Sequence, residues 1–407
     1  MYAAIWAVRH LQHRGRRTLT AVAGIAFAAV LIFLEIGFLE GVNRTATLLF
    51  DQLRFDLLVT SSEYQDLSRT AAFPRQRMIQ AAAAEGVVAV YPLSMGFAQW
   101  RMPRRSGWLT SPTSGGDIGS IAVLAVPPEH IPFVFRIGPD GVFPSLQAAE
   151  QAARLLSRRQ TFLMDQRSKP EYGSVDYWLE QCRRSDPADP VVFNDRSALI
   201  AGSFTLGTGF CWNALLLTSE STFSEYLFPP PETIHFALIQ LESTADIEAV
   251  QQQLQAALPP DVHVWTRAAI TTSERNYWVR LTSVGQFLTV AVLLVVVVGI
   301  IFVYQLMAAD IRAMLPEYAT IKAIGHSPAF AAAVVLWQAV FLAVLGFVPA
   351  WGCALLLYAL ARDYGGIPAS MTLPILAMVA CLTIGMCLLS GLLALRKVHR
   401  ADPADLF

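Results

Sequence analysis

The amino-acid sequence predicts a membrane α-helical protein with four transmembrane helices and a large α+β extracytoplasmic domain between the first and second spans. Composition is the first observation behind this fold class: 54% of the 407 residues are hydrophobic and 15% are charged, whereas about a quarter of a soluble domain is charged. The second observation is that four apolar runs are each long enough to cross the hydrocarbon core of a bilayer. The formal net charge of -1 excludes a generally basic protein that binds nucleic acid.

The first span is expected at residues 18–41. Residues 1–17 alternate apolar and basic side chains, which suits the headgroup layer on the cytoplasmic side. A cleaved signal peptide is the alternative, but the apolar run continues for about ten residues past the cleavage-like sequence Ala26-Phe27-Ala28, which favours an uncleaved anchor. Glu35 is the acid well inside this run. It is expected to reach lipid headgroups or Arg44, and a role within the membrane is the other interpretation.

Three further spans are predicted at residues 284–307, 329–361 and 373–395. The run at 329–361 is too long for one straight crossing, because a helix rises about 1.5 Å per residue against a core about 30 Å thick. Pro349 lies within it and is the expected kink.

The orientation follows from the lysine and arginine residues near the span ends. They gather in residues 1–17, in the connecting segment 308–328 and in the tail 396–407, whereas the loop 362–372 has one arginine. The positive-inside rule therefore puts both termini and the segment 308–328 in the cytoplasm. The domain at 42–283 is then expected on the outer side of the membrane.

The domain at 42–283 shows a strand–helix–strand pattern twice. This repetition indicates a ferredoxin-like unit, interrupted by an insertion at about 127–231 that contains one helix and further strands. Residues 103–120 match no pattern. The first pattern has strands at 56–60 and 87–91 around a helix at 77–85, the second has strands at 235–241 and 262–266 around a helix ending near Leu258, and the insertion has a helix at 147–159 with strands near Ala198 and Leu215.

Two apolar stripes flank this domain and predict helical stalks that continue the first and second spans. If the stalks pack together, they tie the domain to both spans; the alternative is that they are helix ends packed in the domain core. The stripe after the first span is Val42, Ala46, Leu49 and Leu53, and the stripe before the second is Tyr277, Leu281, Val284 and Leu288.

The segment 308–328 predicts a short helix on the membrane surface. Pro316 suits its first position and Gly325 can adopt the left-handed conformation that ends it. Tyr318, Ile321 and Ile324 recur at three-residue spacing. Such a helix could pass force from a soluble partner to the spans on either side, and an ordinary amphipathic connector is the alternative.

Sequence motifs of known catalytic and cofactor sites are absent from the chain. It has no G-x-x-x-x-G-K-[ST], no H-E-x-x-H, no zinc-type Cys/His spacing and no G-x-S-x-G. We therefore expect a protein that is not an enzyme and has no cofactor. Cys182 and Cys211 could form a disulfide if the domain lies outside the cytoplasm.

Three stretches resemble the MacB/FtsX-type ABC transporter permeases, and in particular their DevC branch. They are the segment 315–325 (LPEYATIKAIG), the tail 390–407 and the stretch 165–173 (DQRSKPEYG). The resemblance covers nearly the whole chain. Pro316 departs from the wider superfamily, where a basic residue more often precedes the glutamate, and agrees with the branch.

This resemblance implies a multi-pass permease of the bacterial inner membrane, with residues 42–283 in the periplasm. It would pair with a second copy and bind a separate cytoplasmic ATPase, which holds the ATP. The coupling residues would be Glu317, Tyr318, Ile321, Lys322 and Ile324. Motion of the stalks would drive a glycolipid or another envelope component through a membrane fusion protein and an outer-membrane channel.

Two alternatives share this architecture. The first is a permease that extracts lipoproteins and hands them to a soluble carrier. The second is an FtsX-like regulator that moves no substrate and activates a periplasmic cell-wall hydrolase, which would bind the insertion at 127–231.

Overall fold

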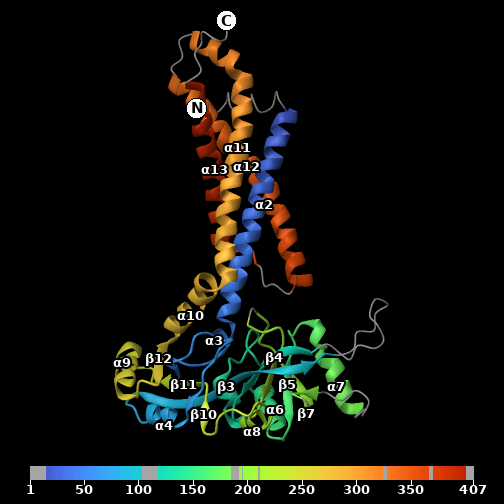
Figure 1. The fold of residues 1–407 in the computed structure, drawn as a ribbon, viewed down its shortest axis with the longest axis vertical. Helices are drawn as coiled ribbons and strands as arrows, with labels where there is room; N and C mark the ends of the chain where they lie inside the picture. Colours follow the sequence, from blue (N-terminus) through green and yellow to red (C-terminus); the bar gives the residue numbers. More distant parts are fainter. Residues whose placement is uncertain are drawn as a thin grey trace. The chain divides into compact units, whose positions relative to one another are not determined.

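The computed structural model describes residues 15–102, 118–184, 192–194, 196–209, 211–323, 328–365 and 370–399. The chain divides into two compact units (Figure 1). The helical unit comprises Met1–Gly41 and Thr282–Phe407, and the sheet unit comprises Val42–Leu281.

The helical unit is built from four long helices: α2 (Gly15–Ala46, whose last turn belongs to the sheet unit), α11 (Ser283–Ala323), α12 (Pro328–Gly365) and α13 (Leu373–His399). Each contains a stretch apolar and long enough to cross a membrane, and these stretches are Thr18–Ala46, Gly285–Gln305, Ala332–Arg362 and Leu373–Ala394. The four predicted spans are confirmed.

Close approaches between these helices hold the helical unit together. A Cβ atom added to Gly346 of α12 would lie 2.6 Å from a side-chain carbon of Ile25, so α2 and α12 need glycine at this point. The Ser390 hydroxyl of α13 donates a hydrogen bond of 3.0 Å to the carbonyl oxygen of Ile300 in α11. Tyr358 of α12 donates through its hydroxyl to the carbonyl oxygen of Phe33 in α2.

The expected helix start at Pro316 is wrong, because α11 continues through this residue to Ala323. An interior proline removes one backbone hydrogen bond, yet strong helix formers surround it, including Leu315 and Glu317, and these favour continuation. Gly325 lies outside the described residues. The helix α12 begins at Pro328, as predicted, and remains a single helix through Pro349.

The first half of the sheet unit is ferredoxin-like, as predicted. Its strands follow the order β12-β1-β11-β3, every neighbouring pair is antiparallel, and α4 and α9 provide the two crossovers. These elements are β1 (Leu57–Ser61), α4 (Gln76–Ala82), β3 (Val87–Arg101), β11 (Phe236–Leu241), α9 (Ile247–Ala257) and β12 (Val262–Thr266).

The second half extends the same sheet instead of forming a separate one. The long strand β3 pairs with β11 as far as Leu93 and with β4 from Ser94 onward. The part of the sheet added to the ferredoxin-like half therefore begins at Ser94, earlier than the insertion expected from residue 127. The strand β4 was missed in the sequence because it follows residues without a recognisable pattern. The order continues β4-β9-β5-β8, with β4 (Ile118–Ala125), β5 (Thr161–Asp165), β8 (Leu199–Phe204) and β9 (Leu215–Thr218).

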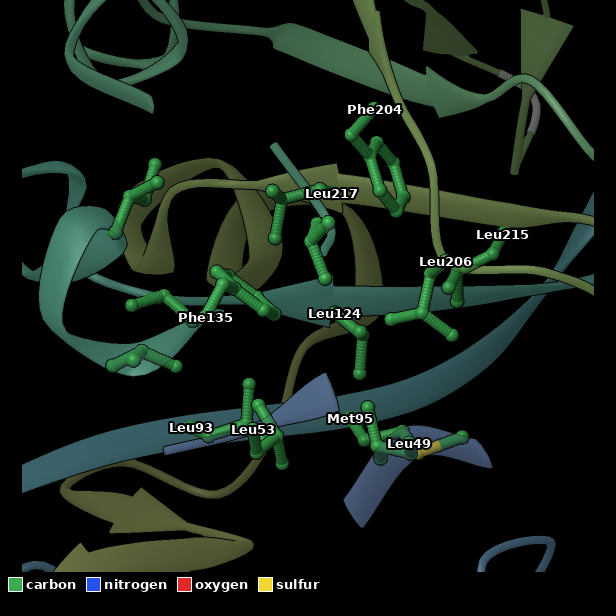
Figure 2. Close-up of a cluster of buried hydrophobic side chains, with 14 of the residues drawn as sticks. Leu49, Leu53, Leu93, Met95, Leu124, Phe135, Phe204, Leu206, Leu215 and Leu217 are labelled. Atoms are coloured by element: carbon green, nitrogen blue, oxygen red, sulfur yellow. The ribbon is translucent and has the colours of Figure 1, made fainter. Parts of the chain in front are cut away.

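Helices cover both faces of this sheet. One face packs against α3 (Leu48–Gln52), α5 (Ile131–Val134), α6 (Leu146–Leu156) and α10 (Arg267–Asn276), and its core includes Leu49, Leu93, Leu124 and Leu217 (Figure 2). The other face packs against α4 and α9 in the first half, and against α7 (Val175–Arg184) and α8 (Glu220–Leu227) in the second. The remaining short elements are β2 (Phe73–Pro74), η1 (Pro128–His130), η2 (Pro170–Tyr172), β6 (Val192–Phe193), β7 (Arg196–Ser197) and β10 (Thr233–Ile234).

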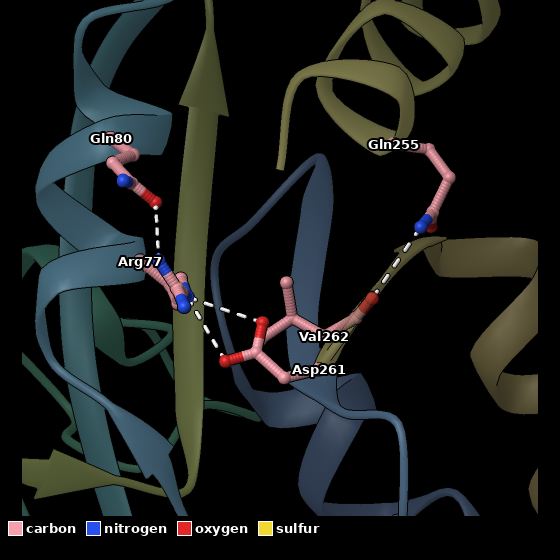
Figure 3. A network of polar contacts seen from close by, with 5 residues as sticks. All are labelled: Arg77, Gln80, Gln255, Asp261 and Val262. Carbon is pink, nitrogen blue, oxygen red and sulfur yellow. Dashed lines mark hydrogen bonds and ion pairs between the residues drawn. The ribbon is translucent and has the colours of Figure 1, made fainter. Parts of the chain in front are cut away.

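The strand β12 forms one edge of the sheet, and side chains of α9 occupy its outer backbone groups. Gln255 donates a hydrogen bond of 3.4 Å to the Val262 carbonyl oxygen (Figure 3). It also accepts one of 2.8 Å from the Val264 amide. Gln251 donates one of 2.9 Å to the Val264 carbonyl oxygen. Such caps prevent an edge strand from pairing with another chain.

Candidate functional site: the junction in the sheet unit

We use the name junction for residues 42–56 and 267–281 of the sheet unit, the two segments that connect it along the chain to α2 and α11. The first segment begins as the last turn of α2, which ends at Ala46. Thr47 interrupts the helix with φ -103° and ψ 0°, and its hydroxyl donates a hydrogen bond of 2.8 Å to Oδ2 of Asp51. The short helix α3 follows.

The stalk predicted after the first span is therefore not one continuous helix to Leu53. All four of its predicted residues, Val42, Ala46, Leu49 and Leu53, are at most 1% exposed. Leu49 and Leu53 lie in the main core of the sheet unit, which agrees with the alternative that these residues pack as part of the domain. Their role as a lever remains a prediction.

Arg267 joins the two segments of the junction. It is the first residue of α10, which Thr266 caps by accepting a hydrogen bond from the Ala269 amide. Its guanidinium donates to the carbonyl oxygens of Phe50, Leu53 and Phe55 at 2.6, 2.9 and 2.8 Å. These oxygens include carbonyls at the end of α3, which have no partner within that helix.

Further contacts reinforce this clamp. The guanidinium carbon of Arg267 lies 4.0 Å from the centre of the Phe55 ring, an attractive cation–π geometry. Ile270, one turn later on α10, is fully buried in the same core as Leu49 and Phe50. Burial lowers the pKa of Arg267, although an arginine remains charged at neutral pH.

A buried acidic group lies one further turn along α10. Glu274 is 1% exposed, and the Tyr64 hydroxyl donates a hydrogen bond to its carboxyl group. Burial raises the pKa of Glu274 to about 7; the nearby Asp66 contributes to this increase, and the hydrogen bond from Tyr64 opposes it. Arg267, Ile270 and Glu274 recur at helical spacing on one face, and this spacing was the signal in the sequence that our interpretation missed.

The second segment does not run straight into α11. Residues Tyr277–Leu281 form the π-helical segment η3, and α11 starts at Ser283, so the predicted second stripe is interrupted. Tyr277 is half-buried, Leu281 is 70% exposed and Leu288 is buried within the helical unit. The Val284 side chain lies outside the described residues. Single π-helical turns are common at functional positions.

The predicted coupling residues lie at the other end of α11. Glu317, Tyr318, Ile321 and Lys322 are in its last turns, and their side chains fall outside the described part of the chain, as does Ile324. Their contact with an ATPase stays a prediction.

Cys182 and Cys211 are both free thiols and belong to different cores of the sheet unit. The Cys182 sulfur instead accepts a hydrogen bond of 3.3 Å from the Ile200 amide. The structure thus does not bring the proposed disulfide together. Among the described residues, no group of three or more His, Cys, Asp or Glu side chains is arranged to hold a metal ion.

The stretch 165–173, one of the three that carry the resemblance, stabilises the second half of the sheet. The buried Asp165 carboxylate accepts hydrogen bonds from the amides of Arg167, Leu206 and Gly207. The carbonyl oxygen of Tyr172 accepts from the indoles of two tryptophans, Trp100 and Trp178, at 3.2 and 2.8 Å. Gly173 follows at φ +89°, which favours glycine.

A comparison with protein families gave one match, which lies in the membrane region. Residues 289–403 match the family described as FtsX-like permease C-terminal, and they include two of the four candidate spans and most of a third. This part of the helical unit is therefore similar to FtsX-like permeases. Permeases of this kind are membrane subunits of ABC-type transporters, and the predicted resemblance to the MacB/FtsX superfamily is confirmed.

Two solved structures are similar to part of this chain. The extracellular domain of the noncanonical ABC-type transporter YknZ from Gram-positive bacteria is 10% identical, with 52% of this chain and 99% of that chain covered and a TM-score of 0.32. The periplasmic region of MacB from Actinobacillus actinomycetemcomitans is 9% identical, with 54% and 92% covered and a TM-score of 0.31. A comparison with curated proteins gave no match.

Proposed function

We propose that this chain is the permease subunit of a MacB/DevC-type ABC exporter, which converts ATP hydrolysis by a separate cytoplasmic ATPase into motion of a periplasmic domain. The cargo would be a glycolipid or another hydrophobic envelope component. In this proposal both termini are cytoplasmic, two copies of the permease pair in the inner membrane, and a membrane fusion protein and an outer-membrane channel complete the path.

The junction is the observation that supports this proposal most directly. The chain segments that lead to α2 and to α11 are held at one place, since Arg267 bonds three carbonyl oxygens of the first segment from the start of the second. Displacement of either helix would therefore act on the core of the sheet unit at this place. The coupling residues Glu317, Tyr318, Ile321 and Lys322 would receive the ATPase movement at the far end of α11.

The substitution Tyr318→Asp tests the coupling step. A charge placed in an apolar contact should abolish association with the ATPase, because burying an unpaired carboxylate costs several kcal/mol. The measurement is co-purification of the ATPase with the full permease in detergent. Ile79→Asp, at an exposed apolar residue of the sheet unit, is the matched control and should retain the ATPase.

Two controls make this result interpretable. Gel filtration of the Tyr318→Asp permease should show the same elution volume as the wild-type protein, so that unfolding does not explain the loss. Undiminished recovery of the ATPase with this variant would remove the coupling assignment.

The partner proteins distinguish export from the two alternatives, lipoprotein extraction and regulation of a cell-wall hydrolase. A gene for a membrane fusion protein beside the permease gene favours export, and a gene for a soluble periplasmic carrier favours lipoprotein extraction. An FtsX-like regulator would instead bind a cell-wall hydrolase. A pull-down with the full chain would detect that hydrolase.

A further inference from the structure

The sheet unit contains a hollow of about 770 Å³ beside the junction. Its lining carries three arginines, Arg54, Arg136 and Arg267, and two aspartates, Asp51 and Asp56. Arg54 and Arg136 are exposed and Arg267 is partly buried. Charged side chains of both signs therefore share one concave surface, and the positive charges outnumber the negative ones.

The three guanidinium groups are compensated by neutral oxygens. The Arg54 guanidinium donates to the carbonyl oxygen of Pro132 at a long 3.5 Å, and the Arg136 guanidinium donates to that of Asp51 at 3.2 Å. Arg267 donates to the three carbonyls of the clamp. Among the described residues none of the three forms an ion pair within 4.0 Å, in contrast to Arg75, Arg77, Arg154 and Arg196 of the same unit.

The charges of both aspartates favour the charged form of Arg267, and each carboxylate also accepts a hydrogen bond from a group that is not an arginine. Oδ2 of Asp51 accepts the Thr47 hydroxyl at 2.8 Å, and Oδ2 of Asp56 accepts the Leu241 amide at 2.9 Å. Each carboxylate thus stabilises local backbone or side-chain geometry. Three guanidinium groups against two carboxylates leave the hollow with one excess positive charge and with arginine N–H donors on its exposed side.

We propose that this hollow binds a phosphate group. Planar guanidinium groups present paired N–H donors that match the oxygens of a phosphate, and two such groups from different segments, Arg54 after α3 and Arg136 after α5, line the same hollow. This site goes beyond the proposed export function and does not depend on an ATPase or on a cargo.

The phosphate could belong to a soluble compound or to the headgroup of an anionic phospholipid. Asp51 stands five residues after Ala46, where the first apolar span ends. Five extended residues reach at most about 18 Å. A lipid headgroup is therefore one source within reach, and the chemistry of recognition is the same for both.

The test uses the full permease in dodecyl maltoside without phosphate buffer. One arm titrates inorganic phosphate by isothermal calorimetry. The other arm counts bound lipid by native mass spectrometry after addition of dioleoyl phosphatidylglycerol, with dioleoylglycerol, which lacks the phosphate, as the control lipid. Binding of phosphate alone identifies a soluble ligand, and binding of phosphatidylglycerol but not dioleoylglycerol identifies a headgroup; either result supports the site.

Variants locate the ligand in the hollow. The double substitution Arg54→Gln with Arg136→Gln should weaken binding by at least about tenfold, since it removes two charge-assisted hydrogen-bond donors. Arg158→Gln with Arg159→Gln, at two exposed arginines outside the hollow, should bind as the wild type does. The two single variants at Arg54 and Arg136 serve if the double variant does not fold. The proposal is overturned if the wild type binds neither ligand, or if the Arg54/Arg136 variants bind with unchanged affinity.

Discussion

Two residues of α10 define the chemistry of the junction, and they act in different ways. Arg267 is a charged donor shared by three backbone oxygens. Glu274 is a buried acid whose pKa is raised to about 7, chiefly by burial. The first holds the chain segments together at any physiological pH, and the second changes its charge near neutrality.

Replacing Arg267 with methionine should destabilise the permease by about 3 kcal/mol, because hydrogen bonds from a charged donor contribute roughly 1.5–3 kcal/mol and their loss leaves carbonyl oxygens without a partner. Arg267→Lys should lose less, since it keeps the charge but not the planar donor geometry. The measurement is urea unfolding of the full chain in detergent. Arg154→Met, at an exposed arginine, should change stability by less than about 0.5 kcal/mol. Equal effects at both positions would refute the clamp.

The substitution Glu274→Gln should flatten the dependence of stability on pH. The pKa of about 7 in the folded chain exceeds the ordinary value of 4.5, so between these values the folded chain holds a proton that the unfolded chain has released. The stability contributed by the neutral carboxyl is complete below about pH 4.5 and is lost as the pH rises through about 7, by up to about 3 kcal/mol.

Thermal unfolding of the full chain from pH 4.5 to 8 measures this effect. The unfolding midpoint of the wild type should fall more steeply over this range than that of Glu274→Gln. Glu85→Gln, at an exposed glutamate, should fall as the wild type does. Parallel curves for the wild type and Glu274→Gln would show that the carboxyl titrates outside this window.

At the scale of single elements, the exposed edge of the sheet is closed by side chains. Gln251 and Gln255 of α9 take up both backbone groups of Val264 and the carbonyl oxygen of Val262. The ion pair between Arg77 of α4 and Asp261, at 3.0 Å, fixes the start of the same strand (Figure 3). The edge strand β12 is thus protected by the two crossover helices of the ferredoxin-like half.

The double substitution Gln251→Leu with Gln255→Leu should expose this edge and promote self-association, because unpaired strand backbone pairs readily with another chain. Light scattering coupled to gel filtration measures the mass of the detergent-solubilised permease. Gln252→Leu with Gln253→Leu adds the same apolar surface at exposed positions of the same helix and should leave the mass unchanged. If both double variants associate equally, added hydrophobicity and not the open edge is responsible.

At the scale of the whole molecule, two compact units alternate along the chain: the sheet unit interrupts the helical unit between α2 and α11. The arrangement requires the two ends of the sheet unit to lie close to each other. The junction meets this requirement, because Arg267 reaches back to a segment more than 200 positions earlier in the chain.

The predicted orientation is testable with an epitope tag inserted after His326. The positive-inside rule places this position in the cytoplasm, so an antibody should label it only after cells are permeabilised. A tag inserted after Asp140, at an exposed position of the sheet unit, should be labelled once the outer membrane alone is opened. The reverse pattern would place the proposed coupling residues on the wrong side of the membrane for an ATPase.

The sequence by itself determined the four spans and the ferredoxin-like half. The length of an apolar run and the alternation of strand and helix patterns are local properties, which neighbouring residues reveal without knowledge of distant contacts. The prediction of a helix start at Pro316 was wrong, because it gave one proline more weight than the helix-forming residues around it.

Tertiary structure alone decided the junction, the hollow and the continuation of the sheet beyond β3. Arg267 and Phe50 are 217 positions apart, and Arg54 and Arg136 come from different loops, so no local pattern connects them. From the sequence alone, the apolar residues Leu49 and Leu53 fit a helical stalk and a domain core equally well. The tertiary structure shows that they belong to the domain core, because it buries both side chains against β3, β4 and Ile270.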